Sequence, residues 1–121
     1  MKLNHVTISV KDMEESVNFY RDVIGLTVKT RFSPSAGIEI AFLGDGGSDV
    51  ELIYRQTQTE ITIGEDISLG FEVCSMGEIM DVLRQKGFSA SEIYQPVPQI
   101  KYFFATDPNG VRIQFLENVK Y

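Results

Sequence analysis

The feature that most constrains the fold of this chain is an internal repeat. A shift of 63 residues places segment 5–10 (HVTISV) on segment 68–73 (SLGFEV), and segment 50–53 (VELI) on segment 113–116 (IQFL). Repetition within one chain indicates that a supersecondary unit is used twice and that neither copy buries its apolar surface alone. The sequence therefore predicts two similar modules.

The first half predicts one strand, one helix and then three strands. In the opening strand Val6, Ile8 and Val10 share one face, while the polar residues between them share the other. Asp12 suits a helix N-cap, and Gly25 suits the end of that helix. The expected strands are 3–10, 26–32, 38–43 and 50–54, around a helix over 13–24.

The second half predicts the same order. Its expected strands are 68–73, 89–94, 100–106 and 111–117, around a helix over 75–86 that ends at Gly87. The tetrapeptide Asp107-Pro108-Asn109-Gly110 has the composition of a β-turn. A polar linker precedes this half, in which Ile61 and Ile63 are candidates for a short strand.

These elements predict an α+β fold of two βαβββ modules. Module one covers about 1–55, the linker about 56–66 and module two about 67–121, and together they form a single domain over 1–121.

Composition excludes several classes of function. The 121 residues hold 17 acidic and 11 basic side chains, and this net charge of −6 without a basic block disfavours nucleic-acid binding. The single Cys cannot form an intrachain disulfide. No segment resembles a signal peptide or a membrane span, so we expect a cytoplasmic protein without a membrane partner. The single His excludes a two-histidine iron triad within one chain.

Three segments resemble the vicinal oxygen chelate superfamily, which includes glyoxalase I, bleomycin-resistance proteins and extradiol dioxygenases. They are 3–12 (LNHVTISVKD), 16–26 (SVNFYRDVIGL) and 104–115 (FATDPNGVRIQF). The resemblance implies that the two modules pair into an open, cupped, β-barrel-like sheet with a cavity between them. It also implies a homodimer and a small-molecule ligand or substrate.

The resemblance further implies a set of four metal-ligand positions. Matched residue by residue, they fall on His5, Glu51, Ser68 and Gln114, and the 63-residue shift relates the first to the third and the second to the fourth. His5, Glu51 and Gln114 are the candidate ligands for a divalent metal such as zinc, nickel, manganese or iron. Ser68 stands where the family usually has His, and Gln114 stands where it usually has Glu.

Two classes of function stay open on these residues. Glu51 and Gln114 hold the catalytic positions, although a Gln amide cannot act as a general base. The substitutions at 68 and 114 favour a metal-free or weakly metal-binding protein that binds a small molecule, as resistance proteins do. The alternative is a metal-dependent lyase or isomerase of the lactoylglutathione lyase type, whereas extradiol dioxygenase chemistry is not expected.

The candidate ligand-binding residues are Arg31, Tyr102, Phe104 and Ser68. Each has an ordinary structural alternative, because aromatic residues in strands mostly serve packing. A lone His on the polar face of a strand is likewise often a hydrogen-bonded surface residue.

Overall fold

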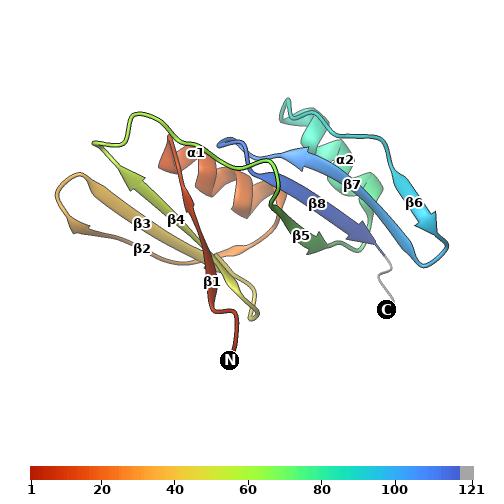
Figure 1. The fold of residues 1–121 in the computed structure, drawn as a ribbon, viewed down its shortest axis with the longest axis horizontal. Helices are drawn as coiled ribbons and strands as arrows, with labels where there is room; N and C mark the ends of the chain where they lie inside the picture. Colours follow the sequence, from red (N-terminus) through yellow and green to blue (C-terminus); the bar gives the residue numbers. More distant parts are fainter. Residues whose placement is uncertain (118–121) are drawn as a thin grey trace. The chain divides into compact units, whose positions relative to one another are not determined.

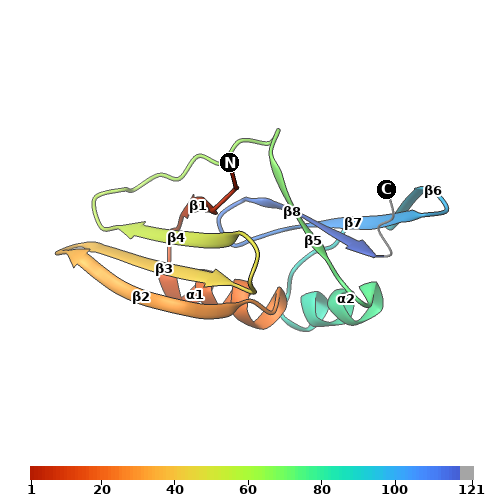
Figure 2. The same ribbon diagram turned by 90° about the horizontal axis from the view of Figure 1, so that it is seen from below.

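Two four-stranded mixed sheets, each with helix on one face, make up the fold (Figures 1 and 2). The computed structural model describes residues 1–117, and none of the helices in that part is long and apolar enough to cross a membrane. The chain divides into two compact units, Met1–Thr62 and a second unit that starts at Ile63. That the two units form a single domain stays a prediction.

Both units have the same topology, so the α+β prediction of two βαβββ modules is confirmed. The first sheet has the order β1-β4-β3-β2 and the second has the order β5-β8-β7-β6. In each, the first strand pairs in parallel with the last, and the remaining pairs are antiparallel. The strands of the first unit are β1 (His5–Ser9), β2 (Thr27–Ser35), β3 (Ile38–Gly44) and β4 (Asp49–Arg55). Those of the second are β5 (Ser68–Glu72), β6 (Tyr94–Val97), β7 (Ile100–Thr106) and β8 (Arg112–Glu117).

Two strand predictions are wrong. No strand forms around Ile61 and Ile63, where the chain is irregular. The expected strand over 89–94 is replaced by β6, and only a single bridge between Ala90 and Ala105 remains in the earlier segment. Because β6 lies at the edge of its sheet, it tolerates Pro96, which the sequence suggested as a strand breaker.

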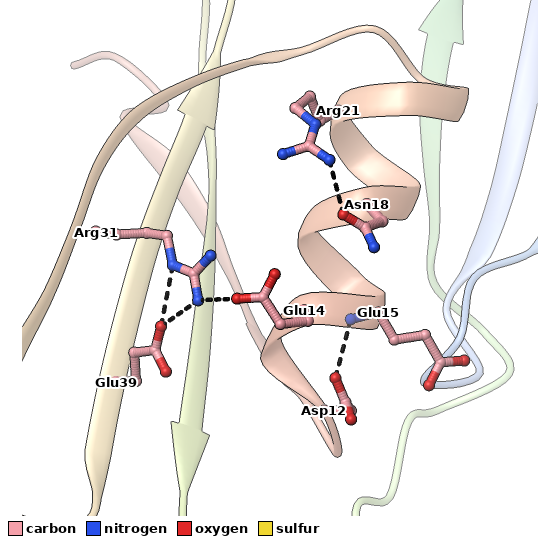
Figure 3. Close-up of polar contacts among 7 residues, drawn as sticks. All are labelled: Asp12, Glu14, Glu15, Asn18, Arg21, Arg31 and Glu39. Atoms are coloured by element: carbon pink, nitrogen blue, oxygen red, sulfur yellow. Dashed lines mark hydrogen bonds and ion pairs between the residues drawn. The ribbon is translucent and has the colours of Figure 1, made fainter.

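The helices begin where the repeat predicts. Asp12 accepts a hydrogen bond from the Glu15 backbone N–H at 2.9 Å and caps α1 (Met13–Asn18), as Figure 3 shows. Ser75 caps α2 (Met76–Gln85) by accepting from the Glu78 backbone N–H at 3.3 Å. The expected helix over 13–24 changes after α1 into the π-helix η1 (Phe19–Val23).

Each sheet has one face in a helix-covered core and one face of mixed polarity. In the first unit the fully buried strand residues include Ala41 and Leu43 on β3 and Leu52 on β4. Leu52 is the register partner of Ala41. In the second unit the stacked rings of Phe103 and Phe115 are both 0 % exposed. The alternating residues of the same strands therefore point to the opposite face, where the candidate site residues lie.

Two glycines of the second unit test where α2 ends. Replacing them with alanine is expected to change the free energy of unfolding in opposite directions. Gly87 ends the α2 segment at φ +82°, so we expect Gly87→Ala to lower the free energy of unfolding by about 1 kcal/mol. Gly77 lies inside α2, and an added Cβ meets only Ser75 Oγ at 3.8 Å. Gly77→Ala is expected to raise stability by about 0.5 kcal/mol, because Ala has the higher helix propensity. Urea unfolding of both variants checks the signs, and equal destabilisation would contradict them.

Candidate functional site

The polar centre of the first unit is a cluster of three side chains on β1 and β4. Thr7 and Glu51 are register partners, and Thr7 Oγ1 donates to Glu51 Oε1 at 2.5 Å. His5 Nε2 lies 3.6 Å from the same carboxylate oxygen. The Glu51 side chain is 15 % exposed and that of His5 is 38 % exposed, so a molecule from solution can reach the imidazole. The structure thus brings together the two first-unit positions that the resemblance singles out.

The orientation of both groups is fixed by neighbours. His5 Nδ1 lies 2.7 Å from Asn4 Oδ1. In the tautomer with the proton on Nδ1, this N–H donates to Asn4 and Nε2 keeps its lone pair. The edge of the ring also meets Phe42, with ring centroids 5.6 Å apart. Within residues 1–117, Glu51 Oε2 has no hydrogen-bond partner, so this oxygen is available as an acceptor.

A second carboxylate lies next to this cluster. Asp49 is the register partner of His5, and its Oδ2 accepts from Lys29 Nζ at 2.8 Å. Its Oδ1 is buried without a hydrogen-bond partner and lies so close to Gly44 that a side chain there would collide with it. Lys29 therefore neutralises one of the two carboxylates on this face and leaves Glu51 as the anionic group beside His5.

The second unit holds the other two matched positions on its helix-free face. Ser68 is exposed and pairs with Arg112, while Gln114 pairs with Gly70, whose missing side chain leaves room beside the amide. A Cβ on Gly70 would lie 3.7 Å from Gln114 Oε1 and 3.2 Å from a Leu116 methyl group. Gln114 thus lies beside open backbone rather than in a packed core.

Tyr102 and Phe104 lie on the same face as Gln114, and their role in ligand binding stays a prediction. Phe104 pairs with Gln114 across β7 and β8, and the Tyr102 and Phe104 ring centroids are 5.6 Å apart. Two further residues join them, Tyr94 from β6 and Arg112 from β8. Sequence reasoning did not select Arg112, although it lies two residues before Gln114 and alternation places both on one face.

Arg31 lies apart from His5 and Glu51. It pairs with the buried Ala41 and therefore points to the helix side of the first sheet. There its guanidinium Nη2 donates to Glu14 Oε1 at 2.6 Å, and the group also donates to Glu39 (Figure 3). Hydrogen bonds to Glu14 and Glu39 raise the pKa of Arg31, so its charge is permanent. A role for Arg31 in ligand binding stays a prediction.

The family to which the chain belongs follows from a comparison with known proteins. The model of the Glyoxalase/Bleomycin resistance protein/Dioxygenase superfamily matches residues 2–115. The chain belongs to this superfamily. The match includes both sheets and all four positions that the resemblance assigned to the ligand set.

Individual members of the superfamily match over nearly the whole chain. The lactoylglutathione lyase of Haemophilus influenzae is 29 % identical over 128 residues, which cover 98 % of this chain and 93 % of the relative. A glyoxalase family protein from Bacillus cereus has a TM-score of 0.85 at 20 % identity, covering 99 % of this chain and 95 % of the other. The trypanothione-dependent glyoxalase I of Leishmania major has a TM-score of 0.81 at 23 % identity, covering 98 % and 87 %. These structures support the fold.

The donors of this superfamily member fit only half of a divalent-metal site. The Nε2 lone pair of His5 and a Glu51 oxygen, 3.6 Å apart, have suitable chemistry and spacing for two ligands. Ser68 and Gln114 offer a hydroxyl and an amide, both neutral, where catalytic zinc sites hold at least three protein ligands of the His, Cys or carboxylate type. Within residues 1–117, no group of three or more His, Cys, Asp or Glu side chains is placed to hold a metal ion. The residues present therefore do not complete a divalent-metal site.

Proposed function

We propose that this superfamily member binds a small molecule through the Thr7–Glu51–His5 cluster and does not depend on a divalent metal. The observation that carries the proposal is the donor set, in which only two of the four matched positions hold strong ligands while Glu51 Oε2 is free to accept. The homodimer that the resemblance implies belongs to the same proposal.

Each of the three side chains has its own role in binding the ligand. Thr7 occupies one oxygen of the Glu51 carboxylate and so orients the other toward a ligand hydroxyl or N–H group. In the tautomer that donates from Nδ1 to Asn4, His5 presents Nε2 beside that carboxylate as a second hydrogen-bond acceptor for the ligand. A hydrogen bond to an ionised carboxylate is about twice as strong as one between neutral groups, which makes Glu51 the main polar anchor.

A second candidate function rests on the names of the relatives. Proteins called lactoylglutathione lyase match 97–98 % of this chain at 26–29 % identity. In this case His5, Glu51 and Gln114 would hold a divalent metal that polarises the oxygens of a substrate, and Glu51 would be the available proton acceptor. Gln114 could orient a substrate but could not take up a proton.

Metal titration distinguishes the two candidates. We expect untagged protein to show a change in melting temperature below about 1 °C with zinc, nickel, cobalt or manganese at about 50 µM, because a weak site adds little stability. We also expect no isomerisation of the hemithioacetal of methylglyoxal and glutathione with any of these metals. A rise of several degrees that His5→Ala removes, together with metal-dependent isomerisation, would overturn the proposal in favour of the lyase.

A further inference from the structure

The helix-free face of the second sheet carries an aromatic cluster that the first sheet lacks. Tyr94 and Tyr102 are register partners with stacked rings, whose centroids are 5.6 Å apart at an interplanar angle of 29°. Phe104 meets Tyr102 edge to face at 5.6 Å. Phe103 and Ala105, which alternate with Tyr102 and Phe104 along β7, point into the core. The cluster is therefore not part of the hydrophobic core of its unit.

Part of this aromatic surface is open to solvent. Tyr94 is 40 % exposed, and it lies on the edge strand β6, whose four residues are all exposed. The guanidinium carbon of Arg112 lies 3.9 Å from the centroid of the Phe104 ring and covers one of its faces. The aromatic surface that a ligand can reach is consequently that of Tyr94 and Tyr102. The guanidinium of Arg112 lies at the Phe104 end of this surface.

The charge on Arg112 is not neutralised by an ion pair. Within residues 1–117 no carboxylate lies within ion-pair distance of it, and its only specific contact is the Phe104 ring. The internal repeat emphasises the difference, because the 63-residue shift places Arg112 on Asp49, which Lys29 neutralises. The corresponding positions of the two sheets thus have opposite charges, and among residues 1–117 only Asp49 of the two has an ion-pair partner.

A pocket of about 670 Å³ lies beside Phe104 and Arg112 within the second unit. Tyr94 and Tyr102 do not line this pocket, so it adjoins the Arg112 end of the aromatic surface and not the tyrosine rings. Hydroxyl groups of Ser89, Ser91 and Thr106 line it, together with the carboxylates of Glu65 and Asp66. One arginine therefore offers a place for one negative group, whereas the two carboxylates oppose a second one.

From these observations we propose that the second unit binds planar aromatic molecules that carry a single acidic group. The rings of the ligand lie against Tyr94 and Tyr102, and its carboxylate pairs with the guanidinium of Arg112. This inference goes beyond the proposed function, because it assigns a ligand class to the second unit and does not involve the Thr7–Glu51–His5 cluster of the first. Aromatic stacking supplies contact area, and a carboxylate matches the fork of N–H donors on an arginine.

Calorimetric titration with 2-naphthoate in EDTA tests the proposal. We expect a dissociation constant below about 1 mM for the protein, and a weakening of at least about tenfold in Arg112→Met. Tyr94→Leu should weaken binding several-fold, since it removes the exposed ring. The matched control is Arg84→Met, which removes an exposed arginine of α2 on the helix side of the same unit and should leave affinity unchanged.

Two further ligands keep the test independent of the variants. Decahydro-2-naphthoate keeps the acid but has no aromatic ring, and naphthalene-2,3-dicarboxylate places a second acid next to the first, at the Arg112 end, where Glu65 and Asp66 should repel it. Both are expected to bind at least about fivefold more weakly than 2-naphthoate. Absence of binding by 2-naphthoate, equal affinity of Arg112→Met, or equal affinity of the saturated acid would overturn the ligand class. Those results would leave the metal titration unaffected, whereas metal-dependent isomerisation would overturn the proposed function whatever 2-naphthoate does.

Discussion

Replacing Ser68 with His and Gln114 with Glu is expected to give this protein a divalent-metal site that raises its melting temperature when zinc or nickel is added. The two substitutions supply the imidazole and the carboxylate that the superfamily resemblance places at these positions, in one ligand set with His5 and Glu51. Moving from two strong ligands to four should raise metal affinity by at least about two orders of magnitude. At a metal concentration about a hundred times the dissociation constant, binding adds about 2.7 kcal/mol to stability.

Three controls show whether the gain comes from these positions. Adding His5→Ala to the double variant should remove most of the gain, because it deletes one of the four ligands. Ser35→His with Gln85→Glu introduces the same side chains at exposed positions outside the set and outside the pocket that Glu65 and Asp66 line, and its melting should not respond to metal. If the double variant is folded and its melting temperature is the same with and without metal, then the assignment of 68 and 114 to one ligand set with His5 and Glu51 is wrong.

The fold was largely predictable because its main signals are local. Alternation along 5–10, the cap at Asp12 and the 63-residue repeat predict the order of elements in both units. The strand β6 was not predictable in this way, since Pro96 is a breaker in a central strand and is tolerated only at a sheet edge. Whether a strand is an edge depends on pairing, which a single strand's sequence does not encode.

The candidate site was predictable where strands are regular and unpredictable where they are not. Alternation correctly places His5 and Thr7 on one face, and the pairing of β1 with β4 then brings Glu51 to them. Arg31 lies beyond an irregularity in the register between Val28 and Thr30, so counting along β2 does not reveal that it points to the helix side. Its partners, Glu14 and Glu39, come from elements distant in sequence, and no spacing rule connects them.

The turn between β7 and β8 shows how a motif can be recognised from sequence while its energetics come from structure. Asp107 is only 4 % exposed, and its Oδ1 accepts from the backbone N–H groups of Asn109 at 2.8 Å and Val111 at 2.7 Å. Gly110 completes the turn at φ +98°. The composition of the tetrapeptide predicts a turn, but only the structure shows that a buried carboxylate replaces strand pairing for two backbone donors.

Asp107→Ala is therefore expected to lower the free energy of unfolding by about 3 kcal/mol, because it leaves two buried N–H groups without their acceptor. Asp107→Asn keeps an oxygen at the same position and should cost about 1 kcal/mol. Asp45→Ala changes the same residue type in the exposed turn before β4 and should stay within about 0.5 kcal/mol of the original protein. Urea unfolding of the three variants measures this order. Equal stability of Asp107→Ala and Asp45→Ala would mean that water satisfies the Asn109 and Val111 donors, so that the carboxylate does not hold this end of the second sheet together.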